Sequence, residues 1–424
     1  MLQFLYNNNI TILKMYSKCR FLRQIGDIMN FIFISPGFPH TYWNFCDRLK
    51  KNGANVLGIG DTPYDLLEDN LKAALTEYYW VETLENYDNV YRAVAFFAFK
   101  YGKIDWLESN NEYWLEQDAK LRTDFNITTG AQLEEVSRYK SKYAMKKYYE
   151  IAGVPTARCH QITTKEAAKE FLATVDYPVI VKPNIGVGAA STYKLENDAD
   201  FDHFFDNYPS VPYVMEEFVE GDICSYDAIL DNDIEPLFES TTSWPPSIMD
   251  IVNKKLDLSY YTEADLPEKL KEVGRKTVKA FGVKNRFVHL EFFRLTKARK
   301  GLGEVGDFVG LEVNMRPAGG YTPDMMNYAH STDVYQIWAD MVTANARLLP
   351  DRHEDHFCVY ASRRDFNHYV HSHEEVMAKY GHLIEMNERA PEILSGAMGN
   401  YLYIAHAADV DAVHEFIDFV HAKY

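Results

Sequence analysis

Short apolar runs alternate with mixed segments at the start of the chain and predict a parallel α/β unit. The first run, residues 30–35, stops at a Pro–Gly segment, and a second run covers residues 54–60. A segment with helical character lies between them and ends at Gly53. Strand–helix–strand order is typical of a parallel sheet with crossover helices. A further helix and strand downstream extend the predicted N-terminal α/β domain to about residue 137.

Residues 1–28 have no periodic apolar face. Their basic residues follow the apolar start, whereas a secretory signal places its positive charge first. A transit peptide is the alternative, but the Ser and Arg enrichment of such peptides is missing. Because a clean strand begins directly after Met29, we expect residues 1–28 to be an extension outside the core, disordered or upstream of the functional start.

A helix is predicted between residues 137 and 155. Apolar side chains recur there at positions i, i+3, i+4 and i+7, on one helical face: Met145, Tyr148, Tyr149 and Ala152. Gly153 stands at the expected C-terminal stop, with Pro155 just beyond it. Lys142 lies on the same apolar face. From position alone, this lysine either extends its stem towards the surface or reaches into a site.

A small-residue loop between two predicted strands suggests a flap that covers phosphate groups. Strand 177–183 ends with Lys182 and Pro183, and the loop that follows contains Gly186 and Gly188. Glycines let backbone N–H groups approach phosphate oxygens closely, and a lysine supplies a positive charge for them. An ordinary β-hairpin turn is the alternative. The segment lacks the Gly-x-x-x-x-Gly-Lys-Ser/Thr spacing of a Walker loop.

Two later strands carry the residues most typical of a metal site. The first, residues 286–295, contains Glu291. Because strand side chains alternate with period two, the second, residues 308–316, is expected to place four residues on one face: Gly310, Glu312, Asn314 and Arg316. Antiparallel pairing would bring Glu291 beside Glu312 and Asn314, a cluster of hard oxygen ligands that suits Mg²⁺ held jointly with nucleotide phosphates. A solvated sheet face is the alternative.

Composition narrows the class of protein. The chain has 424 residues and a formal net charge of −18, which argues against a general nucleic-acid binder because such affinity depends on basic groups. Five cysteines at wide spacings, without a Cys-x-x-Cys, favour a reducing cytoplasm over a disulfide framework. The sequence also lacks an uninterrupted apolar run of about 18 residues, so we expect no membrane span.

These segments together resemble the ATP-grasp superfamily, in the branch of biotin carboxylase, the large subunit of carbamoyl-phosphate synthetase and carboxylate–amine ligases. The resemblance covers about residues 29–350. It rests on four segments: Glu312-Val-Asn-Met-Arg316-Pro with Glu291 upstream, Lys142 eleven residues before Gly153, Val181-Lys182 before the small-residue loop, and Met215-Glu-Glu-Phe-Val219. The resemblance therefore overrides the surface interpretation of Lys142.

The resemblance implies a role for each matching residue. Lys142, Lys182, Gly186 and Gly188 would hold the ATP phosphates. The adenine would be met by main-chain groups of Glu217 and Val219, with Glu216 near the adenine or Lys182. Mg²⁺, with Mn²⁺ as an alternative, would be bound by Glu291, Glu312 and Asn314. Arg316 would act on the substrate carboxylate or the acyl phosphate. Many relatives carry a ribose-binding acid where this chain has Ile223, with Asp222 beside it.

The implied fold is α/β: a Rossmann-like pre-ATP-grasp domain, a two-lobed α+β ATP-grasp domain and a small C-terminal α/β unit. The expected boundaries are 1–28 for the extension, 29–137, 138–350 and 351–424. The implied activity is an ADP-forming carboxylate–amine ligase that proceeds through an acyl phosphate. Its partners would be small-molecule carboxylates and amines, and a homodimer is left open. Two alternatives remain, a bicarbonate-activating carboxylase or carbamoyl-phosphate-type enzyme and a non-catalytic ATP-binding sensor.

Overall fold

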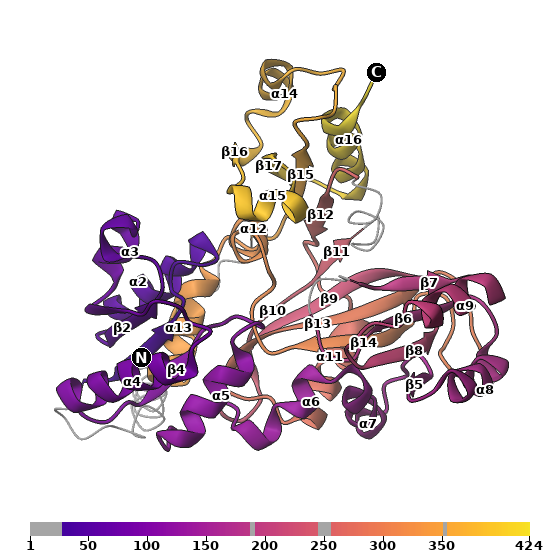
Figure 1. The fold of residues 1–424 in the computed structure, drawn as a ribbon. Coiled ribbons are helices and arrows are strands. Elements are labelled where there is room, and N and C mark those ends of the chain that lie inside the picture. The colour runs from indigo at the N-terminus through magenta and orange to yellow at the C-terminus, as the bar shows by residue number, and fades with distance from the viewer. Residues whose placement is uncertain (1–27, 187–190, 245–255, 351–353) are drawn as a thin grey trace, which may run out of the picture.

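The computed structural model describes residues 28–186, 191–244, 256–350 and 354–424. The predicted extension therefore lies outside the described residues except for Ile28. The predicted phosphate-binding residue Gly188 also lies outside them. Figure 1 shows a parallel sheet at the N-terminal side, two antiparallel sheets beside it and a C-terminal unit above them. None of the described helices is long and apolar enough to cross a membrane.

The N-terminal sheet has four parallel strands in the described residues, in the order β3-β2-β1-β4. The strands are β1 (Asn30–Ile34), β2 (Asn55–Gly60), β3 (Glu77–Trp80) and β4 (Trp106–Glu108). The helices of this part are α2 (Trp43–Lys51), α3 (Asp69–Ala74), α4 (Tyr87–Tyr101) and α5 (Leu115–Asp124), with 3-10 turns η1 (His40–Tyr42), η2 (Tyr64–Leu66) and η3 (Leu133–Glu135). The chain reverses its strand order between β1 and β4, and such a point opens a crevice at the carboxyl ends of the strands.

Strand β1 is buried over its whole length because both faces of the parallel sheet are covered. Phe31 and Phe33 pack on one side with Trp338 from a distant helix, and Ile32 and Ile34 pack on the other side with α4. The apolar run is therefore continuous and does not alternate. The packing of Trp338 joins the N-terminal sheet to the later part of the chain.

A small antiparallel sheet forms one lobe of the central region, in the order β5-β8-β6-β7. Its strands are β5 (Cys159–Gln161), β6 (Val179–Pro183), β7 (Tyr193–Leu195) and β8 (Tyr213–Glu217), and its helices are α8 (Lys165–Val175) and α9 (Asp198–Asp206). The apolar faces of these helices pack on β6 and β8. Lys182 and Glu216 are therefore fixed on adjacent strands.

A second antiparallel sheet runs through the rest of the molecule, in the order β14-β13-β9-β11-β12-β15-β17-β16 with β10 beside β9. Its strands are β9 (Gly221–Leu230), β10 (Pro236–Ser240), β11 (Thr242–Trp244), β12 (Ser259–Thr262), β13 (Arg286–Leu295), β14 (Phe308–Asn314), β15 (Phe357–Arg363), β16 (Ile384–Arg389) and β17 (Tyr401–Ala407). Strand β15 hydrogen-bonds to β12, so the C-terminal segment continues the same sheet. The predicted domain boundaries remain predictions.

The remaining helices lie on this sheet or flank it: α6 (Ser137–Lys140), α7 (Lys142–Ala152), α11 (Glu268–Phe281), α12 (Thr322–Ala329), α13 (Val334–Ala344), α14 (His373–Tyr380), α15 (Glu392–Met398) and α16 (Val410–His421). Helix α7 begins where the Ser141 hydroxyl accepts a hydrogen bond from the Ala144 N–H. It ends at Gly153, whose φ of 67° lies in the left-handed region that favours glycine. The predicted face of Met145 and Tyr149 is buried.

Candidate active site

A buried carboxylate between two lysines lies where β6, β8 and α7 meet. Lys182 Nζ lies 2.7 Å from Glu216 Oε2, and Lys146 Nζ lies 2.6 Å from Glu216 Oε1. Burial alone would raise the pKa of Glu216, but the two lysines lower it to about 2. Glu216 is thus a firmly ionised group, and the cluster of three side chains carries one net positive charge.

Lys142 joins the small-residue loop to the large sheet. Its Nζ lies 2.9 Å from Glu312 Oε1 on β14 and donates to the Gly186 carbonyl oxygen at 3.0 Å. The helix start is anchored there as well, because the Lys142 N–H donates to the Asn184 carbonyl. The predicted phosphate-binding residues Lys142, Lys182 and Gly186 therefore surround one region.

The pairing of β13 with β14 brings two predicted carboxylates together. Glu291 is directly opposite Glu312, and His289 is opposite Asn314. The register shifts just beyond this pair, so that Phe292 faces Gly310 and Leu311 is the extra residue of a bulge. The prediction that Gly310 shares a strand face with Glu312 is wrong, because the bulge reverses the alternation between them. A Cβ at Gly310 would instead meet the Tyr149 ring of α7.

His289 connects Glu291 to a buried aspartate. Its Nδ1 lies 2.7 Å from Asp227 Oδ1 and its Nε2 lies 3.3 Å from Glu291 Oε1. Burial alone would lower the pKa of His289, but the charge of Asp227 and both hydrogen bonds raise it to about 9. Burial alone would likewise raise the pKa of Glu291, and His289, Arg316 and Lys142 lower it instead. Both side chains are therefore charged at neutral pH.

The donor set on β13 and β14 fits a hard divalent cation held together with phosphates. Glu291 and Glu312 supply carboxylate oxygens, and Asn314 adds an amide oxygen. Within the described residues, no group of three or more His, Cys, Asp or Glu side chains is arranged to hold a metal ion alone. Oxygens of a nucleotide and of water would complete the coordination of such an ion.

Arg316 lies beyond the end of β14, which stops at Asn314 and not at residue 316 as predicted. The Met315 carbonyl accepts a hydrogen bond from Arg286 instead of continuing the strand. The guanidinium donates to the Pro317 carbonyl at 2.8 Å and lies 3.4 Å from Asn314 Oδ1. Arg316 nevertheless stays beside the carboxamide of Asn314.

The loops after β1 and β4 lie close enough to Arg316 for its charge to act on Tyr42 and Glu112. The Tyr42 hydroxyl donates to the Asn110 carbonyl at 2.8 Å and ties the two loops together. Burial raises the pKa of the nearby Glu112, while Arg316 acts in the opposite direction and Glu312 raises it further. One carboxylate oxygen of Glu112 has no hydrogen-bond partner in the described part of the chain. The crevice of the N-terminal sheet thus adds an acidic group to the site.

Salt bridges hold the end of β8, the segment whose main chain is expected to bind adenine. The Glu217 carboxylate lies 2.9 Å from Arg158 Nη2 and 2.9 Å from Arg299 Nη2, which directs it away from Lys182. Val219 packs in an apolar cluster with Ala157, and its contribution to a ligand would come from its main chain. Asp222 is exposed on β9, where it pairs in register with Arg294.

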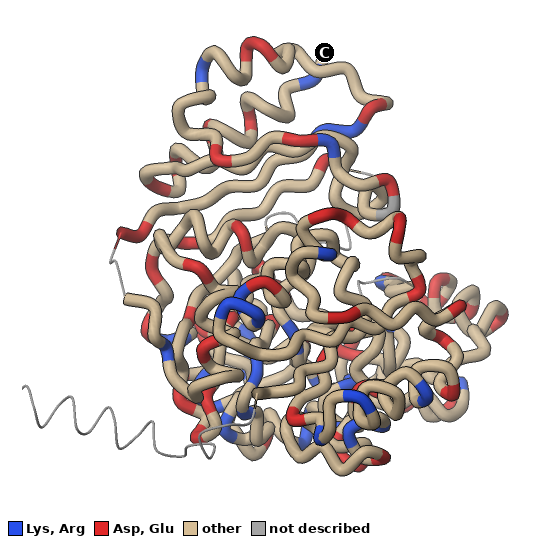
Figure 2. Tube along the Cα trace, turned by 90° about the vertical axis from the view of Figure 1, so that its left-hand side faces the viewer, with Lys and Arg blue, Asp and Glu red and all other residues tan. Residues whose placement is uncertain are grey.

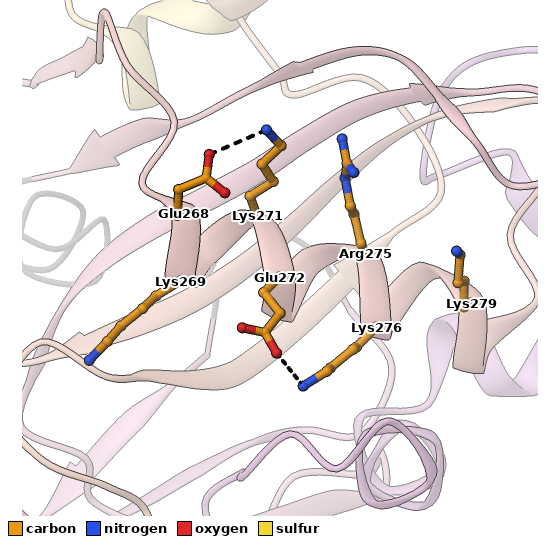
Figure 3. A pocket seen from close by; sticks show the side chains of 7 residues that line it. All are labelled: Glu268, Lys269, Lys271, Glu272, Arg275, Lys276 and Lys279. Atoms are coloured by element: carbon orange, nitrogen blue, oxygen red, sulfur yellow. Dashed lines mark hydrogen bonds and ion pairs between the residues drawn. The ribbon is translucent and has the colours of Figure 1, made fainter.

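A second charged surface lies along α11 (Figure 3) and is accounted for by ion pairs. Each of its basic side chains has an acidic partner: Lys269 with Asp307, Lys271 with Glu268, Arg275 with Glu239, Lys276 with Glu272, and Lys279 with Glu235. Figure 2 shows acidic residues spread over the upper and lower parts of the described trace. The basic residues of α11 therefore do not form a separate anion site.

Residues 139–254 match the family model of the ATP-grasp domain. The chain resembles L-amino acid ligase from Bacillus licheniformis (14% identity, TM-score 0.67, 95% of this chain and 100% of that chain covered). It also resembles phosphoribosylglycinamide synthetase from Anaerococcus prevotii (16% identity, TM-score 0.64, 93% of this chain and 98% of that chain covered).

A third similar structure is the biotin carboxylase domain of 2-oxoglutarate carboxylase from Hydrogenobacter thermophilus, solved with MgADP and bicarbonate (14% identity, TM-score 0.67, 93% of this chain and 90% of that chain covered). The predicted resemblance to ATP-grasp enzymes is confirmed, and so is the predicted α/β fold class. At these identities, the likeness to the solved structures establishes the fold alone.

The sequence analysis gave no role to three residues of the site. Lys146 lies one helical turn after Lys142, a spacing that places both on neighbouring positions of one face. His289 precedes Glu291 by two residues and therefore shares its strand face. Glu112 gives no such signal, because only the packing of the N-terminal sheet brings it near Arg316. The first two could have been found from spacing.

Proposed function

We propose that this chain is an ATP-dependent ligase that converts a carboxylate into an acyl phosphate and couples it to an amine, releasing ADP and phosphate. The observation that carries the proposal is the cross-strand pair Glu291–Glu312, with Lys142 on Glu312 and Arg316 two residues beyond Asn314. In this proposal the oxygens that would bind the metal lie on the paired strands β13 and β14, the lysine that would bind phosphate reaches Glu312 from α7, and the guanidinium lies just beyond the end of β14.

In this proposal the lysines position the triphosphate. Lys142 and Lys182, with main-chain groups around Gly186 and Gly188, bind the phosphate oxygens, while main-chain groups of Glu217 and Val219 hold the adenine. Asp222, beside the position at which many relatives carry a ribose-binding acid, would contact the ribose. Mg²⁺, or Mn²⁺ in its place, would be bound by Glu291, Glu312 and Asn314, and it would neutralise charge on the transferred phosphoryl group. The domain boundaries of 29–137, 138–350 and 351–424 belong to the same proposal.

The chemistry then has two displacement steps. A carboxylate oxygen forms a bond to the γ-phosphorus, and the bond from that phosphorus to the β,γ-bridging oxygen breaks, so ADP leaves. The amine nitrogen next forms a bond to the acyl carbon, the bond to the phosphate oxygen breaks, and the amine loses a proton. Arg316 offers a planar guanidinium to the carboxylate and to the negative charge that develops on it. Water must be kept out, because it would hydrolyse the acyl phosphate.

The proposal is tested by incubating the full chain with ATP, Mg²⁺ and small carboxylates. Bicarbonate is supplied first, then pooled amino acids, and products are identified by mass spectrometry while nucleotides are separated by chromatography. Formation of ADP together with a new amide supports the ligase. ADP formation that depends on bicarbonate indicates the carboxylating alternative, and tight Mg-ATP binding without turnover under any mixture indicates a sensor.

A further inference from the structure

Glu216 has two lysine partners, although one would suffice to neutralise it. The lysines come from different elements, Lys182 from β6 and Lys146 from α7, and each faces its own carboxylate oxygen. The carboxylate is only 5% exposed, and the side chains of Lys182 and Lys146 are 8% and 15% exposed. The Lys146 nitrogen itself is shielded from solvent. This arrangement is a buried triad in which one positive charge is in excess.

Nucleotide binding creates a conflict for this triad. In the proposed function Lys182 binds ATP phosphates, and a lysine amine that moves to a phosphate oxygen leaves the carboxylate it was paired with. A buried carboxylate without a partner is strongly unfavourable, because it has lost both water and its counter-charge. With Lys182 as the only partner, the energy gained at the phosphate would be offset by the charge left behind at Glu216.

We propose that Lys146 is a positioning residue that keeps Glu216 paired while Lys182 moves to the nucleotide. Lys146 is anchored on α7, one turn beyond Lys142, and it does not depend on the strand that carries Lys182. Because it occupies Oε1, the departure of Lys182 from Oε2 leaves the carboxylate with one intact ion pair. This inference rests on the proposed function, since it requires that Lys182 binds ATP.

The test measures ATP affinity of the full chain by calorimetry for a set of variants. Lys146→Met keeps the stem but removes the charge, and we expect it to weaken ATP binding about tenfold or more, the scale of coupling between contacting charged groups. Lys146→Arg should restore most of the affinity. Lys147→Met is the matched control, because Lys147 is the next residue on α7 and is exposed; it should leave ATP affinity unchanged.

A second variant separates this role from a general structural one. Glu216→Gln removes the charge that needs a partner, so adding Lys146→Met to Glu216→Gln should produce little further loss of ATP affinity. If Lys146 only supported the fold, its replacement would weaken ATP binding equally in the unaltered chain and in Glu216→Gln. The inference is overturned if Lys146→Met binds ATP like the unaltered chain, or if the double variant loses as much affinity relative to Glu216→Gln as the single variant loses relative to the unaltered chain.

Lys182→Ala distinguishes this inference from the function on which it rests. If Lys182→Ala binds ATP normally, the proposed nucleotide site is wrong. If Lys182→Ala weakens binding and Lys146→Met does not, only the role of Lys146 is wrong. Should Lys146→Met fail to fold, a crystal structure of the unaltered chain with a non-hydrolysable ATP analogue decides. We expect Lys182 on a phosphate and Lys146 still on Glu216; Lys182 remaining on Glu216, or Lys146 also on a phosphate, overturns the inference.

Discussion

The charged side chains around β14 differ in the partner that each one already has. Among the described residues, Glu312 contacts Lys142 and Glu291 contacts His289, whereas the Arg316 guanidinium donates to the Pro317 carbonyl and the Asn314 amide oxygen. Within the described residues, the hydrogen bonds of the Arg316 guanidinium go to neutral acceptors, while its charge acts on Glu291 and Glu112 without an ion pair at short distance. This difference supports separate roles, with Glu312 at the metal and phosphates and Arg316 at the group that receives the phosphoryl.

Arg316→Ala and Glu312→Gln should therefore affect different steps. Arg316→Ala is expected to leave Mg-ATP affinity nearly intact and to slow the carboxylate-dependent step by a factor on the order of 10², the scale of losing a preorganised donor at developing negative charge. Glu312→Gln removes a charge that the metal needs, so Mg²⁺-dependent ATP binding and turnover should both fall. Calorimetry and steady-state turnover on both variants provide the measurement.

Glu304→Gln is the control for the loss of one carboxylate charge, because Glu304 is exposed in the segment between β13 and β14. It should bind ATP and turn over like the unaltered chain. The separation of roles is contradicted if Arg316→Ala abolishes ATP binding while Glu312→Gln binds ATP normally.

At the scale of elements, the position of α7 decides where two lysines lie. The helix packs against β14 at Gly310, where the Tyr149 ring occupies the space of a Cβ, and the Gly310 N–H donates to the Pro155 carbonyl just after the helix. The bulge at Leu311 adjoins this contact. Gly310 thus permits a close approach that brings Lys142 to Glu312 and Lys146 to Glu216.

Gly310→Ala should disturb both stability and nucleotide binding. A Cβ at this position would lie 2.4 Å from the Tyr149 ring, so α7 must shift. We expect a loss of about 1–3 kcal/mol in the free energy of unfolding, the usual cost of overpacking, together with weaker ATP binding. Denaturant unfolding and calorimetry measure the two effects.

Gly319→Ala is the matched control for stability, because a Cβ at Gly319 meets nothing within 4 Å. Its free energy of unfolding should differ little from that of the unaltered chain. Equal stability of Gly310→Ala and Gly319→Ala would show that the contact between α7 and β14 is looser than described.

The elements also show what the sequence could predict. Period-two alternation placed Glu291 near Glu312 correctly, because both residues lie within long strands with apolar neighbours. The bulge at Leu311 was not predictable, since it accompanies the contact of Gly310 with the distant Tyr149. Pairing of Lys146 with Glu216 likewise needs α7 to lie against β8, 70 residues later in the chain. Local pattern thus identified the strands, whereas tertiary packing completed the site.

At the scale of the whole molecule, a buried network joins the N-terminal sheet to the large sheet. Glu108 at the end of β4 accepts hydrogen bonds from Arg286 at the start of β13 and from Arg122 on α5. Asp118 on α5 lies beside it and accepts hydrogen bonds from the Ser109 N–H at 2.9 Å and the Ser109 hydroxyl at 2.6 Å. Burial, and then the charge of Glu108, raise the pKa of Asp118 to about 7.

The raised pKa of Asp118 predicts a pH dependence of stability. The unfolded chain ionises this carboxyl near pH 4, whereas the folded chain keeps it protonated until about pH 7. Below pH 4 Asp118 therefore does not reduce the free energy of unfolding. As the pH rises from 4 to about 7 the reduction grows, and above pH 7 it stays constant. Asn at position 118 cannot ionise. The difference in free energy of unfolding between Asp118→Asn and the unaltered chain should therefore change by about 2–4 kcal/mol in favour of the variant from pH 4 to pH 8.

Denaturant unfolding across this pH range, followed by circular dichroism, provides the comparison. Only the pH-dependent part of the difference tests the idea, because the replacement also changes the hydrogen bonds with Ser109. Curves that run parallel for the two proteins from pH 4 to pH 8 would show that Asp118 ionises normally in the folded chain.

The central claim is that a carboxylate becomes an acyl phosphate at this site, and oxygen transfer tests it most directly. The full chain is incubated with ATP, Mg²⁺ and carboxylates labelled with ¹⁸O, and the released phosphate is analysed by mass spectrometry. We predict ADP as the nucleotide product and one ¹⁸O atom in each phosphate, because the carboxylate oxygen stays on phosphorus when the acyl group is transferred. Unlabelled phosphate formed together with the coupled product, or AMP as the nucleotide product, would contradict the account.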